Sequence, residues 1–103
     1  MSQEIVSVIA QIRAKPGSEE RLQQELIALV APSRAEKGCL NFDFHRAAEE
    51  RGLFFFYENW SSKGDLDRHL EEPHIKAFLS KTDDLLAEPI GATFWTPIKC
   101  SQS

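Results

Sequence analysis

The segment from Leu53 to Trp60 constrains the fold more than any other part of the chain, because five of its eight residues are aromatic. Aromatic side chains favour a pleated, half-buried surface, so the segment predicts a β-strand. Alternation along a strand places four side chains on one face: Phe54, Phe56, Glu58 and Trp60. Both faces begin with apolar residues, whereas a strand with one wet face would alternate apolar and polar ones. Something must therefore cover each side of the sheet.

A helix is expected to follow this strand. Asp65 comes three positions after Ser62, which is the spacing of a capping box. Pro73 should stop or kink the helix, and a second helical segment should begin near His74. The apolar face of the first segment includes Leu66 and Leu70, with His69 on or beside it. We expect His69 to point toward the sheet.

The remaining elements are predicted from the same kinds of pattern. Strands are expected over 5–14, 39–46 and 91–98, and a helix from about 19 to 37 that Pro32 kinks and Gly38 ends. The order of elements is then βαββαβ, the ferredoxin-like arrangement of the α+β class. We expect one domain over residues 1–103, with a core of about 4–98 and a loose tail over 99–103.

Right-handed crossovers put both helical regions on one side of the four-stranded antiparallel sheet. The other side still carries apolar residues, and a soluble monomer avoids exposing a large apolar patch. A second copy packed sheet against sheet would cover it, so we predict a homodimer through the sheet faces. Asn41 would face either the dimer interface or the mouth of a pocket.

Charge and composition limit the classes of partner that the chain is expected to bind. The formal net charge is −4 and no basic run is present, so we expect no nucleic acid and no anionic membrane surface as a partner. No segment approaches the roughly 20 apolar residues of a membrane span, and the N-terminus lacks the pattern of a signal peptide. Cys39 and Cys100 form no CxxC motif, which fits free thiols in a cytoplasmic protein.

A cavity between sheet and helices would explain why a carboxylate, Glu58, shares a strand face with Phe56 and Trp60. His69 would complete it, either as a hydrogen-bonded core histidine or as a proton carrier, because its ordinary pKa suits acid–base work. Two alternatives stay open here. Glu58 could pair with a lysine or arginine elsewhere, and Trp60 could simply pack in the core.

We predict no metal. His69 and His74 are five residues apart with a proline between them, which is poor spacing for metal ligands, and no cysteine or further histidine completes a zinc set. His74 either caps the second helical segment or contributes to a site. The chain has no GxGxxG, P-loop or GxSxG motif, so nucleotide binding and serine hydrolysis have no support.

Several short motifs, in order, resemble the antibiotic biosynthesis monooxygenase (ABM) domain family over roughly residues 4–98. They are Ala14-Lys15-Pro16-Gly17, Glu36-Lys37-Gly38-Cys39-Leu40, Tyr57-Glu58-Asn59-Trp60, and His69 followed by Glu72-Pro73-His74. The resemblance implies a dimeric α+β barrel of ferredoxin-like protomers, with a small cavity in each. It also implies oxidation of a quinol or polycyclic phenol by dioxygen without metal, flavin or haem.

On this resemblance we expect Phe56 and Trp60 to hold the flat substrate ring, with Leu66 and His74 also in contact with it. His69 would take the phenolic proton, and Glu58 would orient His69 or stabilise its charged form. The expected catalytic residues are thus His69, Glu58 and Trp60, and the expected partners are a small aromatic substrate and dioxygen. No cofactor is expected.

Other functions remain possible from the same residues. Haem-degrading relatives use a histidine where Leu79 stands here, which argues against that activity. Another branch isomerises a phosphorylated autoinducer-like molecule and tends to lack the tryptophan found here as Trp60, yet acid–base isomerisation would use the same His69 and Glu58. A non-catalytic dimeric module that binds a small aromatic ligand is the third candidate.

Overall fold

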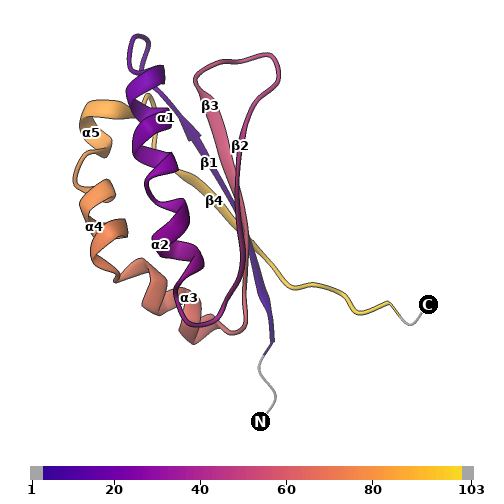
Figure 1. The fold of residues 1–103 in the computed structure, drawn as a ribbon. Helices are drawn as coiled ribbons and strands as arrows, with labels where there is room; N and C mark the ends of the chain where they lie inside the picture. Colours follow the sequence, from indigo (N-terminus) through magenta and orange to yellow (C-terminus); the bar gives the residue numbers. More distant parts are fainter. Residues whose placement is uncertain (1–3, 101–103) are drawn as a thin grey trace.

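The computed structural model describes residues 4–100, and its four strands form one antiparallel sheet in the order β2–β3–β1–β4. The strands are β1 (Val6–Arg13), β2 (Cys39–Arg46), β3 (Leu53–Trp60) and β4 (Gly91–Trp95). β3 and β1 occupy the centre, and the short β4 is an edge strand (Figure 1). The predicted ferredoxin-like α+β fold with a four-stranded antiparallel sheet is confirmed.

Five short helices pack against one face of this sheet (Figure 1). They are α1 (Glu19–Ile27), α2 (Val30–Arg34), α3 (Lys63–Leu70), α4 (Pro73–Leu79) and α5 (Thr82–Leu85). The Ser62 hydroxyl accepts a hydrogen bond from the backbone N–H of Asp65 at 3.1 Å, so the predicted cap of α3 is present. Between residues 4 and 100, no helix is long and apolar enough to cross a bilayer.

Two predicted boundaries need correction. The first helical region divides between Ala28 and Leu29, before Pro32 rather than at it. Pro32 has no N–H for the carbonyl of Ala28, four residues earlier, so the helix loses its continuity one turn upstream of the proline. The last strand ends at Trp95 instead of residue 98. Of the expected loose tail, residues 99–100 lie outside any helix or strand, and 101–103 lie outside the described residues.

A bulge in β2 also changes the predicted faces of that strand. Cys39 pairs with Trp60 and Asn41 pairs with Asn59, which leaves Leu40 without a partner in the ladder. An extra residue of this kind shifts the alternation of side chains by one position. Leu40 is consequently exposed on the outer face, whereas regular alternation along residues 39–46 would place it on the same face as Phe42. Cys39 packs against the core instead.

The core lies between the helices and the inner face of the sheet. β3 contributes the four side chains that were predicted to share one face, and all four are buried. Phe42 and Phe56 are in aromatic contact with ring centroids 4.6 Å apart. The helices close the core with Leu22, Leu26, Leu66, Ile75, Phe78 and Leu85.

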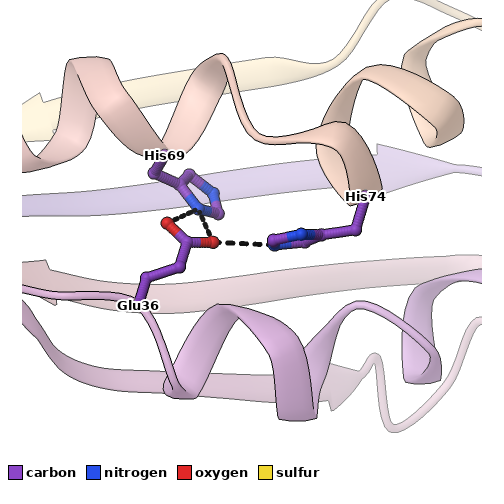
Figure 2. A group of neighbouring side chains, drawn as sticks. All are labelled: Glu36, His69 and His74. Carbon is purple, nitrogen blue, oxygen red and sulfur yellow. Dashed lines mark hydrogen bonds and ion pairs between the residues drawn. The ribbon is translucent and has the colours of Figure 1, made fainter.

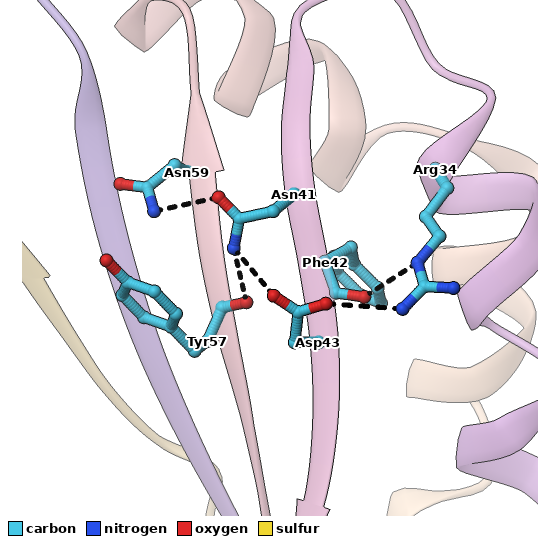
Figure 3. A network of polar contacts seen from close by, with 6 residues as sticks. All are labelled: Arg34, Asn41, Phe42, Asp43, Tyr57 and Asn59. Atoms are coloured by element: carbon cyan, nitrogen blue, oxygen red, sulfur yellow. Dashed lines mark hydrogen bonds and ion pairs between the residues drawn. The ribbon is translucent and has the colours of Figure 1, made fainter.

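The outer face of the sheet carries a ladder of polar side chains (Figure 3). Asn59 donates to the side-chain oxygen of Asn41 at 2.9 Å, and Asn41 donates to Asp43 at 3.1 Å. Arg34 then contacts Asp43 at 3.2 Å. Ser7 extends the ladder to β1 by a hydrogen bond to Asn59. Of the two positions expected for Asn41, the structure places it on this outer face, away from the helices.

Candidate active site

A cavity of about 130 Å³ lies between the inner face of the sheet and the α3–α4 pair. Its polar lining groups are Glu58 and His69, and apolar side chains such as Phe56, Leu66 and Phe78 make up the rest. A dry cavity of about 150 Å³ is large enough to bind benzene, so this one fits about a single aromatic ring. The partly exposed lining residues Leu70, Leu79 and Phe94 place its mouth between α3–α4 and the edge strand β4.

A close backbone approach sets the position of the polar groups behind this cavity. Gly38 has φ +86°, and a Cβ built on it would lie 2.2 Å from the Asp65 carboxylate, so only glycine fits there. The turn before β2 is thereby held against the first turn of α3, and Ser61 donates its N–H to the Gly38 carbonyl at 2.8 Å. Glu36 precedes this turn, and His69 lies one helical turn after Asp65. The two side chains therefore meet.

Glu36 accepts hydrogen bonds from both histidines of this region (Figure 2). Nδ1 of His69 lies 3.0 and 2.9 Å from its two oxygens, and Nε2 of His74 lies 2.7 Å from Oε2. An ionised carboxylate only accepts hydrogen bonds, so Nδ1 of His69 carries a proton. In neutral His69 the other nitrogen, Nε2, then has a free lone pair. His69 lines the cavity and can act there as a proton acceptor.

Aromatic rings enclose His69. Its ring centroid lies 4.4 Å from that of Trp60 and 5.5 Å from that of Phe42. Burial among these rings lowers the pKa of His69, because the charged form loses its hydration, and this outweighs the opposing effect of the Glu36 carboxylate. His69 is accordingly neutral near pH 7 and keeps its lone pair available.

The pKa of Glu58 is shifted in the opposite direction, upward. Its side chain is buried, and burial raises its pKa to about 7; the hydrogen bond from Trp60 works against this, and the charge of Glu36 adds to it. The indole N–H of Trp60 donates to Oε1 of Glu58 at 2.9 Å. Near neutral pH a large share of Glu58 therefore retains its proton. A carboxylic acid in this state can donate a proton into the cavity.

The two polar groups of the cavity have pKa values moved in opposite directions, His69 down and Glu58 up. Such a pair offers a base and an acid at the same pH, which is a common arrangement in sites of acid–base catalysis. The surrounding wall is almost entirely apolar and excludes water from a bound ring. This arrangement can remove a proton from a flat, uncharged molecule and return one.

The structure brings together four of the residues expected at the site: Phe56, Glu58, Leu66 and His69. It corrects the expected role of Trp60, which is fully buried, does not line the cavity and holds Glu58 instead. It also corrects the expected substrate contact of His74, which lines a separate surface hollow with Glu36.

Glu36 is the residue that the sequence interpretation missed as part of the site. The carboxylate expected to orient His69 was Glu58, yet it is Glu36 that bonds His69. The spacing of His69 and His74 was expected to be poor for metal ligands, yet their side chains lie close together around Glu36. The break at Pro73 turns the chain so that both rings reach one carboxylate. The Glu36-Lys37-Gly38 motif could have indicated this role, because a glycine in a tight turn soon after an acidic residue can hold that residue in a fixed position.

Comparison with known families gives a match over residues 5–81 to the family described as antibiotic biosynthesis monooxygenase. A Mycobacterium tuberculosis protein named "Putative monooxygenase Rv0793" is 32% identical over 90% of this chain and 91% of its own length. A Bacillus subtilis protein named "Putative monooxygenase YcnE" is 32% identical over 79% of this chain and 85% of its own length. An uncharacterized Synechocystis protein is 33% identical, but the match spans only 57% of its length.

Solved structures agree with the fold. The crystal structure of PA3566 from Pseudomonas aeruginosa superposes with a TM-score of 0.90 at 35% sequence identity, covering 96% of this chain and 99% of that one. The structure of Rv0793 gives a TM-score of 0.87 at 30% identity, covering 95% and 99% of the two chains. The similarity therefore extends over the sheet and the helices that enclose the cavity.

Proposed function

Because this chain belongs to the antibiotic biosynthesis monooxygenase family, we propose that it oxidises a small phenol or quinol with dioxygen and without a cofactor. The observation that carries this proposal is a cavity the size of one ring whose polar groups are a neutral imidazole and a protonated carboxylic acid. A phenolate can itself give an electron to oxygen. The protein then has to bind the ring, take its proton and exclude water.

In the proposed reaction, Nε2 of His69 accepts the phenolic proton, and Glu36 stabilises the imidazolium that forms. The phenolate reduces dioxygen, and one oxygen atom forms a bond to a ring carbon. The O–O bond breaks, and the second oxygen atom leaves as water with the two hydrogens that the ring loses. Glu58 supplies one proton to this departing oxygen and regains a proton from the His69 imidazolium, so that the phenolic hydrogen reaches the water and both groups return to their starting state. Trp60 holds the carboxyl group of Glu58 in place.

The size of the cavity limits the substrate. A volume of about 130 Å³ matches a single ring, whereas pockets for larger ligands usually measure about 300 Å³ or more. We therefore expect single-ring quinols to fit directly. A naphthoquinol or polycyclic phenol would need Leu79 and Phe94 at the mouth to move apart.

Isomerisation of a phosphorylated molecule has weaker support, because the lining provides no positive charge for a phosphate. No lysine or arginine lies among the cavity residues between positions 4 and 100. Lys37 and Arg68 line the surface hollow instead, on the other side of Glu36. An uncharged ring is the better match to this lining.

The outer sheet face supports the homodimer that we propose as the assembled form. Large apolar side chains remain partly exposed on it, in a hollow of about 500 Å³ between the polar ladder and β4. They are Ile5, Ile9, Leu40, Tyr57 and Trp95. A second copy packed against this face would bury them in a two-fold interface.

Oxygen uptake tests the proposed activity. Protein treated with a chelator would be mixed with benzoquinol or a reduced naphthoquinol, beside a blank without protein. We expect uptake above the blank, with a fall of about 100-fold or more in His69→Ala, because a positioned base contributes about that much. His45→Ala is the matched control, since this exposed histidine stacks on Phe55 on the outer face.

Uptake equal to the blank would contradict the oxygenase. Uptake above the blank that is equal in His69→Ala and the unmodified protein would contradict the role of His69 as the base. A binding module would then be indicated by saturable quenching of tryptophan fluorescence without product. Trp60 contacts His69 directly, so its emission reports on the cavity even though its ring does not line it.

A further inference from the structure

Glu36, His69 and His74 form a cluster whose chemistry goes beyond acid–base catalysis. They come from three segments: the connection before β2, helix α3 and helix α4 (Figure 2). One donor atom from each of the three side chains lies within 4.8 Å of the others. The side chains of His69 and Glu36 are 4% and 9% exposed, and that of His74 is 21% exposed. Two imidazoles and one carboxylate, held together and partly shielded from water, are a donor set for a divalent transition-metal ion.

We propose that this cluster is a binding site for Zn²⁺ and that the bound ion blocks the cavity base. Zinc binds histidine nitrogen at about 2.0–2.1 Å and carboxylate oxygen at about 2.0–2.2 Å, so tetrahedral ligands lie about 3.3 Å apart. The nitrogen–oxygen contacts of 2.7–3.0 Å are already close to that separation. The gap between the two ring nitrogens has to close around the ion, and His74 is the most exposed of the three side chains and so the least restricted by packing.

The surface hollow provides the route of entry. It has a volume of about 470 Å³ and is lined by Glu36 and His74, so an ion reaches the cluster without passing through the substrate cavity. Two basic residues, Lys37 and Arg68, also line the hollow, and Glu72 offsets part of their charge. The guanidinium of Arg68 contacts the Asp65 carboxylate, which offsets its positive charge. Water would supply the fourth ligand from the hollow.

Zinc bound at Nδ1 changes the tautomer of His69. The ion displaces the proton that Nδ1 shares with Glu36 in the metal-free protein. Neutral His69 then carries a proton on Nε2 instead, so the total number of protons on the ring is unchanged. Nε2, the nitrogen left for the cavity, becomes a donor and can no longer accept a phenolic proton. Inhibition by this means rests on the proposed function, whereas binding of the ion does not.

Binding is measured first, by isothermal titration of the full chain with Zn²⁺. A Cys39→Ser, Cys100→Ser background removes the free thiols, which are alternative zinc ligands. We expect one ion per chain, and an affinity at least about tenfold weaker in Glu36→Gln and in His74→Ala, which each lose a ligand. His45→Ala is the matched control and should bind as the background does. Circular dichroism checks that each variant is folded.

Cobalt gives an independent optical test. Co²⁺ in the same background should develop visible bands of a four-coordinate nitrogen and oxygen site, and these bands should be absent from folded Glu36→Gln. Saturable binding with unchanged affinity in Glu36→Gln and His74→Ala, or no saturable binding of either ion, would overturn the site.

Oxygen uptake then tests the effect on His69. With a substrate that supports turnover, Zn²⁺ should abolish most of the uptake, and a chelator should restore it. Full activity with zinc bound would refute the inhibitory role while leaving the binding result intact. If the protein takes up no oxygen at all, the proposed function fails, yet the two binding experiments still decide on the site.

Discussion

The two faces of β3 show how one strand can serve two purposes. On the inner face, Phe54, Phe56, Glu58 and Trp60 are all at most 5% exposed. On the outer face, Tyr57 is 41% exposed and Asn59 is partly buried. The polar groups differ as well. Glu58 accepts a hydrogen bond from Trp60. Asn59 belongs to a ladder that extends to Asn41 on β2 (Figure 3) and also to Ser7 on β1.

This difference makes the inner face suitable for catalysis and the outer face suitable for dimer formation. A buried carboxylate with a single donor is easily protonated, so it can take part in proton transfer. Amide side chains that satisfy one another stay uncharged at any physiological pH, and they leave the apolar groups beside them available for packing. The inner face thus suits chemistry, and the outer face suits a second copy of the chain.

Removal of an aromatic side chain should produce the largest difference between the faces. Phe54→Ala should lower the free energy of unfolding by about 3–5 kcal/mol, because it deletes a fully buried ring. Tyr57→Ala should cost less than half as much in dilute protein, since its ring is partly exposed. Urea denaturation of both variants measures this. Equal losses would show that the two faces are not distinct in packing.

The pH dependence of stability sharpens the contrast at Glu58. Its pKa is raised from the ordinary 4.5 to about 7, so the folded state holds a proton that the unfolded state has lost between these values. The free energy of unfolding therefore falls by about 3 kcal/mol as pH rises from 4.5 to 7, because each unit of pKa shift corresponds to about 1.4 kcal/mol.

Glu58→Gln removes the titrating group and retains an oxygen for the Trp60 N–H. The stability of this variant relative to the unmodified protein should therefore improve by up to about 3 kcal/mol from pH 4.5 to pH 8. Denaturation series at the two pH values measure the change. A difference that is independent of pH would mean that folding does not shift the pKa of Glu58.

A charge on the outer face should weaken the proposed dimer. Ile9→Glu places a carboxylate in the middle of this face, and we expect dimer dissociation to become at least tenfold easier, because the charge would be desolvated without a partner. Ile27→Glu is the control, because Ile27 is at least as exposed as Ile9 but lies on α1. Analytical ultracentrifugation distinguishes them. A monomeric unmodified protein, or equal effects of both substitutions, would rule out this interface.

The smallest effect is expected at the rim of the outer face. Arg34 and Asp43 are 55% and 44% exposed, so their ion pair is largely screened by water. Arg34→Ala should change the free energy of unfolding by no more than about 1 kcal/mol, although it also removes a hydrogen bond to the Phe42 carbonyl. Thermal denaturation is sufficient to measure it. A decrease of several kcal/mol in the free energy of unfolding would show that the Arg34–Asp43 pair contributes as much to stability as a core contact.

The sequence predicts the fold well because each strand has its own local pattern. Alternation identifies both faces of β3, and the Ser62–Asp65 spacing identifies the start of α3. It does not reveal the bulge at Leu40, since an extra residue leaves no mark in a run of alternating side chains.

The candidate site was predictable only in part. Glu58 and His69 follow from polar residues on apolar faces, and both line the cavity. Glu36 lies outside any regular element, so periodicity says nothing about it, and its contact with His69 depends on how the Gly38 turn packs against α3. Trp60 was placed correctly on the inner face, but whether its ring contacts a substrate or Glu58 is a matter of tertiary packing.

The central claim is that His69 presents a free Nε2 to the cavity because Glu36 holds the proton on Nδ1. Long-range proton–nitrogen NMR of the histidine rings measures this directly, with His69→Gln to assign its signals. At pH 8 in the presence of a chelator, we predict that His69 has a protonated Nδ1 and an unprotonated Nε2, and that Glu36→Gln loses this preference. A proton on Nε2 in the resting protein would contradict the account, since His69 could then not act as the base.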